Sequence, residues 1–199
     1  MKDKKKIFKY LLKGVLVFLL FYYSAYLQLI PIYLFKLDPH NISSSLNVLL
    51  SCFSNIILVM ILWFIYRKEL KAEWKIFKDR AAWNTDIMFK YWMTGLAVMM
   101  VSNIIISSFL NAGQAENEQA VQSMINALPW AMLIDAGILA PFIEEIVFRK
   151  CFRDVFQNKW IFAIASALVF GGMHVVNASS AVGYLFIIPY GCLGFVFAL

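Results

Sequence analysis

Charged residues are scarce in this chain, at 15% of 199 residues against about 25% in an ordinary soluble domain. Hydrophobic residues make up 62%, against roughly 45–50% in soluble domains. The five prolines and nine glycines are too few for a fibrous or disordered chain. Apolar runs such as Val15–Leu20 and Asn55–Tyr66 could not all be buried in one core of this size. The composition disfavours a soluble single domain and predicts a polytopic membrane protein.

Cysteine is also rare. The three cysteines, Cys52, Cys151 and Cys192, are an odd number and lack C-x-x-C spacing. Neither a disulfide framework nor a cysteine zinc site is indicated, so we interpret them as small residues of a membrane core. The net charge of +6 is interpreted as a signal of membrane topology, and no nucleic-acid partner is expected.

Six stretches approach the 20 or so apolar residues that a membrane-spanning helix needs. The sequence therefore predicts an all-α membrane bundle of about six spans. The first span is too long for a cleaved signal peptide, although Ser24 and Ala25 interrupt it. No internal repeat is visible, which weakens a transporter built from inverted halves. The predicted spans are Tyr10–Phe35, Leu46–Tyr66, Met88–Leu110, Leu128–Phe148, Trp160–Val176 and Gly183–Leu199.

Lysine and arginine concentrate in three regions, the N-terminal segment 2–13, the second connection 67–80 and the fourth connection 149–159. Basic residues accumulate in loops that stay in the cytoplasm. The three regions alternate with the predicted spans, so we expect a multi-pass protein of the cell membrane with a cytoplasmic N-terminus. The polar stretch Asn111–Asn126 is predicted to be an exposed loop on the outer side.

The second connection has its own pattern. Apolar residues fall on one helical stripe, and lysines occupy the other faces. We therefore predict an interfacial amphipathic helix near 68–84, lying on the inner leaflet of the lipid bilayer. The stripe consists of Leu70, Trp74, Phe77 and Ala81.

Ionisable side chains inside spans cost about 2.5–3.5 kcal/mol each on insertion scales, so they are kept mainly where they pair or work. The fourth and fifth spans hold nearly all of them: Asp135, Glu144, Glu145, Arg149 and His174. Glu145 and Arg149 are four residues apart and can pair on one helix face. Glu144 is turned about 100° away, which leaves its carboxylate for another partner.

Two further features concern the same region. Pro141 cannot donate an N–H to the carbonyl four residues back, so the helix is expected to bend or open one turn before the acids. The tripeptide Gln157-Asn158-Lys159 is typical of a turn between antiparallel helices. Glu144 and His174 each lie 15 residues from Lys159, which predicts that they sit at one level of a hairpin.

A carboxylate and an imidazole at one depth could polarise a water for attack on a peptide carbonyl, or could share a metal ion. Gly171 and Gly172 would let a neighbouring helix or an extended substrate approach closely. Each feature also has a purely structural interpretation. The acids and Arg149 can form a helix-end ion pair, His174 can be a packing residue, and the two glycines can serve helix packing. Asp135 is interpreted as a polar contact between helices.

The motif Glu144-Glu145-x-x-x-Arg149, followed by Phe170-x-x-x-His174, resembles the first two motifs of the CPBP (Abi) family. This family contains type II CAAX prenyl endopeptidases and bacterial relatives linked to bacteriocin processing or self-immunity. The resemblance covers mainly Leu128–Leu199. It divides the chain into an N-terminal transmembrane region, residues 1–127, and a catalytic region, residues 128–199.

The resemblance implies an intramembrane endopeptidase in which Glu144 and His174 activate the hydrolytic water. Glu145 and Arg149 would shape the site. Residues 170–172, which are Phe170, Gly171 and Gly172, are the candidates for substrate binding. Members of the family have been described both as zinc enzymes and as metal-independent glutamate proteases. We favour the version without a cofactor, with zinc as the alternative, because only one histidine stands at the right place.

The chain departs from the family pattern in one respect. A third motif, a histidine followed four residues later by Asn or Asp, is thought to stabilise the oxyanion, yet the only histidines are His40 and His174. The sequence also stops at Leu199, inside an apolar run. We therefore expect a chain that is truncated at its C-terminus. Loss of oxyanion stabilisation typically costs about 10²–10³ in rate, so this fragment alone is expected to be impaired.

The leading hypothesis is an intramembrane endopeptidase that cleaves a membrane-associated protein or peptide. The first alternative is a non-catalytic protein of bacteriocin self-immunity or a membrane scaffold. The second is a proton-coupled carrier that uses the same buried acids. The identity of the substrate, and whether it is prenylated, stays open at this point.

Overall fold

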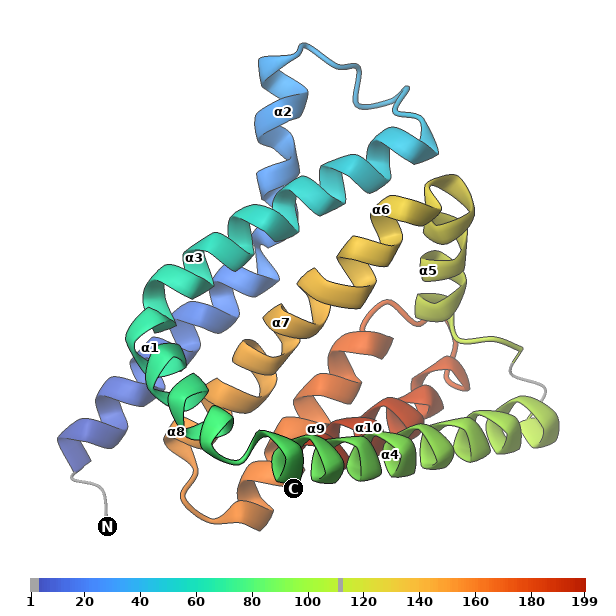
Figure 1. Ribbon diagram of the computed structural model, residues 1–199. Helices are drawn as coiled ribbons and strands as arrows, with labels where there is room; N and C mark the ends of the chain where they lie inside the picture. The colour runs from blue at the N-terminus through green and yellow to red at the C-terminus, as the bar shows by residue number, and fades with distance from the viewer. Residues whose placement is uncertain (1–3, 111–112) are drawn as a thin grey trace. The chain divides into compact units, whose positions relative to one another are not determined.

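The computed structural model describes residues 4–110 and 113–199 (Figure 1). Within these ranges all regular structure is helical, so the predicted all-α class is confirmed. Lys2, part of the N-terminal lysine cluster, and Asn111, the first residue of the predicted loop, lie outside the described residues.

The helices follow one another with short connections, and several apolar stretches are divided into pieces. Labels η mark 3₁₀ or π-helical segments. The elements are α1 (Lys4–Tyr22), η1 (Ser24–Gln28), α2 (Leu29–Leu34), α3 (Ser44–Asp79), α4 (Ala81–Leu110), α5 (Glu116–Ala127), α6 (Pro129–Ile134), η2 (Asp135–Leu139), α7 (Ala140–Glu144), η3 (Glu145–Lys150), α8 (Cys151–Val155), α9 (Lys159–Val175), η4 (Gly183–Phe186) and α10 (Ile187–Ala198).

Three of the predicted spans correspond to helices that are long and apolar enough to cross a membrane. Helices α3 and α4 meet this test individually. The segments Lys5–Tyr22 and Ser24–Leu34 meet it together as a pair bent by 48°. The bend falls beside Ser24 and Ala25, the residues that interrupt the first apolar stretch.

The predicted count of six spans is not confirmed. The stretch of the fourth span consists of short α-helical pieces alternating with π-helical segments. Helix α9 has 17 residues, at the lower limit of a spanning helix, and α10 has 12. By length and composition alone, the described residues contain two spans, or three if the bent pair is one span.

The predicted interfacial helix near 68–84 is helical but is not a separate element, and its position on the inner leaflet stays a prediction. Residues up to Asp79 continue α3 without a break, and α4 begins at Ala81 after a turn at Arg80. The physical reason is that Ser44–Asp79 contains neither glycine nor proline, so nothing ends the helix where the apolar stretch gives way to lysines.

The predicted outer loop is also largely helical, since α5 covers Glu116–Ala127. The apolar residues of α5 that fall on one helix face are few, and polar residues surround them in the sequence. Val121, Met124 and Ala127 pack against a buried cluster formed by Val48, Ala131 and Met132.

The described residues form two compact units. The first consists of the described residues up to Arg67 together with Ala120–Val155, and the second consists of Lys68–Gln119 together with Phe156–Leu199. The predicted division at residues 127 and 128 stays a prediction.

In the first unit, α1 lies along α8 and η3. Gly14 of α1 faces the Cβ atom of Cys151, and the rings of Phe21 and Phe148 meet edge to face with centroids 5.3 Å apart. Tyr66 of α3 is buried, and its hydroxyl lies 3.2 Å from the Sγ atom of Cys151. These contacts bring the helix that carries the acids against α1 and α3.

In the second unit, α10 packs against both α9 and α4. A buried cluster of Ile106, Ala115, Val175 and Phe186 joins α4, the residue before α5, the end of α9 and the end of η4. The histidine of the second motif is therefore carried by a helix that packs along α10 and joins this cluster at Val175.

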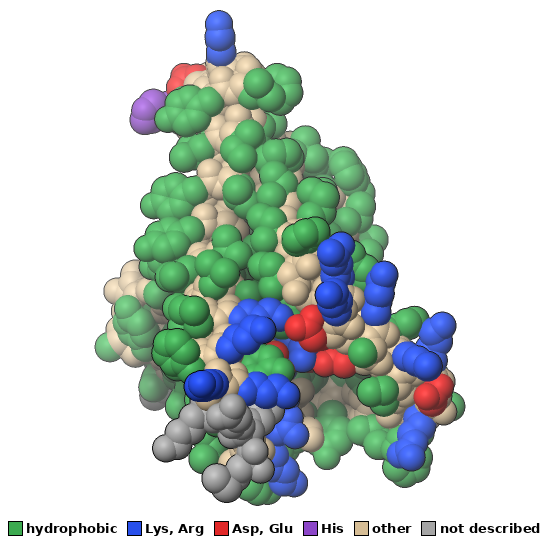
Figure 2. Space-filling model, turned by 90° about the vertical axis from the view of Figure 1, so that its left-hand side faces the viewer, with side chains coloured by type: hydrophobic (Ala, Val, Ile, Leu, Met, Phe, Trp, Pro, Cys, Tyr) green, Lys and Arg blue, Asp and Glu red, His purple; other side chains and the backbone are tan. Residues whose placement is uncertain are grey.

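Large hydrophobic side chains remain exposed along many helices, as on α1, where Phe8 is 67% and Leu12 is 62% exposed. Figure 2 shows hydrophobic side chains covering much of one face, with lysine and arginine gathered in patches. Apolar surface of this extent is too large for contact with water and is typical of a protein surrounded by lipid. The chain is a membrane protein.

Candidate active site

The two acids lie in a helix that widens on either side of Glu144. The π-helical segment η2 ends at Leu139, α7 ends at Glu144, and a second π-helical segment, η3, begins at Glu145. Pro141 lacks the N–H of an ordinary helix residue, so the predicted opening one turn before the acids is confirmed. Such π-helical turns occur frequently at functional sites.

The predicted pair between Glu145 and Arg149 is present. Nε of Arg149 lies 3.9 Å from Oε2 of Glu145, an ion-pair distance that is too long for a direct hydrogen bond. The arginine side chain is only 5% exposed and that of Glu145 is 65% exposed. Glu144, the adjacent residue, is partly buried, so the two acids have different surroundings as the sequence predicts.

Asp135 makes the contact between helices that its position indicates. Its Oδ1 atom accepts a hydrogen bond of 2.9 Å from Nδ2 of Asn55 on α3, and Asp135 is 6% exposed. Cys52, one turn earlier on α3, has its Sγ atom 3.8 Å from the carbonyl oxygen of Ala131. These two contacts join α3 to the segment that precedes Pro141.

The predicted turn before α9 is also present. Oδ1 of Asn158 accepts hydrogen bonds from the backbone N–H groups of Trp160, at 2.9 Å, and Ile161, at 3.2 Å. An asparagine in this position caps the helix by satisfying N–H groups of its first turn. These hydrogen bonds define the start of α9, the helix that carries His174.

His174 is half-buried, and its ring is held on the helix by a backbone contact. Nδ1 lies 2.8 Å from the carbonyl oxygen of Phe170. Since a carbonyl only accepts, Nδ1 must carry the proton, and a neutral ring then presents a lone pair at Nε2. The ring of Phe170 lies beside that of His174, with centroids 4.4 Å apart. Phe170 is 3% exposed, which suits packing against the histidine better than contact with a substrate.

The two glycines have different surroundings. A Cβ atom on Gly171 would stand 2.8 Å from the carbonyl oxygen of Ile187 and 2.9 Å from the backbone nitrogen of Gly191. Gly171 therefore permits the close approach of α10, which is the packing interpretation. A Cβ atom on Gly172 would meet no described atom within 4 Å, so substrate contact at Gly172 stays open as a prediction.

Sequence reasoning missed a second aromatic neighbour of the histidine. The ring of Tyr190, on α10, stacks on that of His174 with centroids 4.5 Å apart and an angle of 25° between the planes. An aromatic residue inside an apolar run resembles ordinary packing, and no local pattern connects positions 174 and 190. Only the packing of α9 on α10 brings them together.

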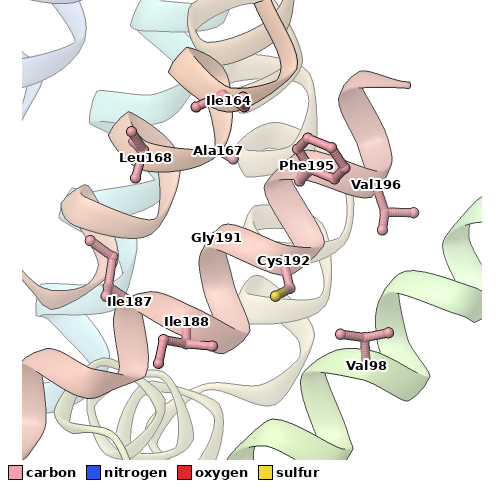
Figure 3. A pocket seen from close by; sticks show the side chains of 10 residues that line it. All are labelled: Val98, Ile164, Ala167, Leu168, Ile187, Ile188, Gly191, Cys192, Phe195 and Val196. Carbon is pink, nitrogen blue, oxygen red and sulfur yellow. The ribbon is translucent and has the colours of Figure 1, made fainter. Parts of the chain in front are cut away.

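A cavity of about 410 Å³ lies in the second unit among α4, α9 and α10 (Figure 3). Its lining is almost wholly hydrocarbon and includes Val98, Leu168, Ile188 and Phe195. Cavities of this kind contact a ligand only through dispersion and the hydrophobic effect. Sequence reasoning missed this cavity, because its apolar lining residues resemble those of a lipid-facing helix.

Glu144 belongs to the first unit and His174 to the second, and each is described within its own unit. Their approach across the turn at Asn158 stays a prediction. Within the described ranges 4–110 and 113–199, no three side chains of His, Cys, Asp or Glu gather as metal ligands would. Catalytic zinc usually takes three ligands from the protein, and the version without a cofactor stays a prediction.

Comparison with known proteins identifies the region that carries both motifs. Residues 126–199 match the family model described as type II CAAX prenyl endopeptidase Rce1-like. UPF0177 protein YajF of Lactococcus lactis is 32% identical over 76 residues, which are 36% of this chain and 38% of that protein. A Bacillus subtilis protein named "Putative membrane peptidase YdiL" is 33% identical over 88 residues, which are 43% of this chain and 33% of that protein.

The chain thus spans between 33% and 38% of the length of these curated relatives. No solved structure matches it. The segment matched by the family model contains the motif residues Glu144, Glu145, Arg149, Phe170 and His174. This match confirms the resemblance to the CPBP family, and the similarity to the Rce1-like family model is confined to residues 126–199.

Proposed function

We propose that the chain is part of an intramembrane endopeptidase of the CPBP type, which hydrolyses a peptide bond of a membrane-associated protein or peptide. The single observation that carries the proposal is the family match over residues 126–199, because it includes every residue of both motifs. The name of the Bacillus subtilis relative points the same way. The local arrangement around each motif is compatible with the roles derived below.

In the proposed reaction, Glu144 is the general base. Its carboxylate takes one proton from a water molecule, and the oxygen of that water attacks the peptide carbonyl carbon. The lone pair at Nε2 of His174 accepts a hydrogen bond from the second O–H of the water, which orients the attack. The tetrahedral intermediate then breaks its C–N bond, and Glu144 returns the proton to the leaving amine.

Glu145 and Arg149 have a different role in this proposal. Their ion pair lies along η3, immediately after Glu144, and Arg149 is buried. The pair holds the direction in which the neighbouring carboxylate points and does not react itself. Charged groups in a spanning region cost free energy, and such a positioning role accounts for their presence.

Glu144→Gln should abolish cleavage of the peptide substrate and leave membrane insertion unchanged. The amide keeps the shape of the side chain but cannot accept the proton of water. Glu145→Gln is the matched control on the adjacent position, and we expect it to reduce cleavage only partially. The measurement is cleavage of a membrane peptide by purified, reconstituted protein.

Cleavage by the Glu144→Gln variant at the wild-type rate would refute the catalytic role. If wild type and Glu144→Gln protect cells equally from a secreted bacteriocin while neither cleaves any substrate, the non-catalytic immunity function replaces the proposal.

Activity should also survive removal of metal ions. The proposed general base needs no ion, whereas a zinc mechanism requires the metal to lower the pKa of its bound water. Cleavage is measured before and after exhaustive treatment with a strong chelator, with a known zinc peptidase as the control. Loss of activity that zinc specifically restores would contradict the metal-independent mechanism.

A further inference from the structure

The N-terminal turn of α5 is tied to the connection that follows α9. The carboxylate of Glu116 accepts hydrogen bonds from the hydroxyl of Ser179 and, at 3.0 Å, from its backbone N–H. These hydrogen bonds hold the pKa of Glu116 below its ordinary value, the hydroxyl contributing most. Both residues are exposed, and neither belongs to a motif.

The next residue of α5 reaches toward α10. Nδ2 of Asn117 donates to the hydroxyl of Tyr190 over 3.4 Å. Tyr190 is half-buried and also packs against the buried cluster that contains Val175 and Phe186. The phenol is thus held at its hydroxyl by α5 and along its ring by neighbouring apolar side chains.

The face of the same phenol lies against the imidazole of His174, at the 4.5 Å separation and 25° angle given above. Phe170 lies 4.4 Å from that imidazole, between ring centroids. The orientation of the imidazole depends on two side-chain torsion angles. The hydrogen bond from Nδ1 to the Phe170 carbonyl forms in only one combination of these angles. A ring fixed against its face opposes rotation away from that combination.

We propose that Tyr190 is a positioning residue for His174, and that Asn117 at the start of α5 fixes Tyr190 in turn. The proposal deepens the function proposed above and depends on it for its catalytic consequence. Tyr190 keeps Nδ1 of the imidazole on the Phe170 carbonyl, and so keeps the lone pair at Nε2 directed at the reacting water. Helix α5 thereby acts on the proposed site from outside both motifs.

The first test observes the imidazole itself and requires no activity. The chain has only two histidines, so ¹⁵N labelling of histidine in reconstituted protein gives few signals, and His40→Asn assigns the exposed one. At a pH where the ring is neutral, we expect His174 to be protonated at Nδ1 and not at Nε2. Contacts between the His174 and Tyr190 rings should appear in the wild-type spectrum without any substitution.

Tyr190→Leu removes the stacked ring and should give a mixture of the two tautomers at His174. Tyr190→Phe keeps the ring and should retain the wild-type tautomer. Tyr184→Leu removes a half-exposed tyrosine six residues away and serves as the matched control.

The second test measures peptide cleavage. Misplacement of a catalytic group by about 1 Å can cost about 100-fold in rate, so Tyr190→Leu should lower kcat by about 10- to 100-fold with little change in KM. Tyr190→Phe should restore most of the rate, and Asn117→Ala should lower it less than Tyr190→Leu does.

Wild-type spectra without contacts between the two rings would overturn the proposal, and this result does not depend on the folding of any variant. An unchanged tautomer in folded Tyr190→Leu would overturn it as well. If the spectra change as expected but neither wild type nor variants cleave a peptide, the positioning of the imidazole stands and the peptidase function fails.

Discussion

At the scale of single residues, Gly171 and Gly172 are adjacent glycines in one helix with different surroundings. They are adjacent on α9, but only Gly171 faces the backbone of α10 at a distance that excludes a side chain. The interface is built on contact between main chains, as is common where helices pack in membranes. The histidine three residues later owes its place beside Tyr190 to this close approach.

Gly171→Ala should destabilise the protein by about 1–3 kcal/mol, because the backbone of α10 has to move to admit the methyl group. Gly172→Ala is the matched control. Its Cβ meets no described atom within 4 Å, and alanine favours a helix over glycine by about 0.8–1 kcal/mol, so stability should be unchanged or raised. Thermal unfolding in detergent measures both. Equal effects of the two substitutions would contradict the assignment.

The contacts that were predicted correctly involve either a partner close in sequence or a charged group that costs much free energy when it is buried without a hydrogen bond. The Glu145–Arg149 pair follows from a spacing of four residues, and the contact of Asp135 follows from the cost of leaving an acid without a hydrogen bond in an apolar surrounding. Tyr190 could not be predicted, because its partner lies on another helix and its neighbours in sequence are all apolar. The joint placement of Glu144 and His174 stays a prediction for the same reason.

At the scale of helices, periodicity predicted the helical state well and the ends of the helices less well. Helix α3 passes through the junction between apolar and basic residues, because no proline, glycine or capping residue stops it. In α5, polar residues hide a stripe that becomes apparent only when its packing partners are known. Pro141 predicted an opening before the acids, but neither its π-helical form nor the second π-helical segment after Glu144 was predicted.

The attachment of α5 to the connection after α9 should be lost in acid. The pKa of the Glu116 carboxyl is lower in the folded state than in the unfolded chain. The hydrogen bonds to Ser179 therefore stabilise the folded state fully above the pKa of the unfolded chain, and this stabilisation is lost as the pH falls through the pKa of the folded state. After correction for intrinsic rates, hydrogen exchange at the Ser179 amide should accelerate in that acidic range.

Glu116→Gln is the control for this prediction. Its amide oxygen still accepts a hydrogen bond but does not titrate between neutral and acidic pH. Corrected exchange at Ser179 should therefore be independent of pH in this variant. The same acid dependence in the variant and the wild type would assign the effect to another group.

At the scale of the whole molecule, the distribution of charge carries information that helix length does not. Basic residues cluster near the start of the chain, after the second predicted span and after the fourth, while the other connections carry few. Length and composition identify two or three spans among the described helices. If the basic connections all stay in the cytoplasm, the charge pattern predicts that the shorter helices cross as well; this topology, with a cytoplasmic N-terminus, stays a prediction.

Labelling of single cysteines from outside the cell tests the topology, after the three native cysteines have been replaced by serine. Cysteines placed at Lys36 and Ala181 should react with a reagent that cannot cross the membrane. Cysteines at Lys78 and Gln157 should react only after permeabilisation. Reaction of Gln157→Cys and Ala181→Cys from the same side would mean that α9 does not cross the bilayer, and six spans would be wrong.

The π-helical segments on both sides of Glu144 affect which single-residue deletions the helix can accommodate. A π-helical turn holds one residue more than an α-helical turn, so it is geometrically equivalent to an insertion of one residue that the flanking helix has absorbed. Deleting one residue within Asp135–Leu139 could restore an α-helical turn and keep both flanks helical. The same deletion anywhere in α7 would rotate Glu144 by about 100° relative to Asp135. Codon deletions should therefore be tolerated better at Ala136–Leu139 than in the five residues of α7, whereas deletion of Glu145 or Arg149 from η3 should be harmful because it removes the proposed positioning pair.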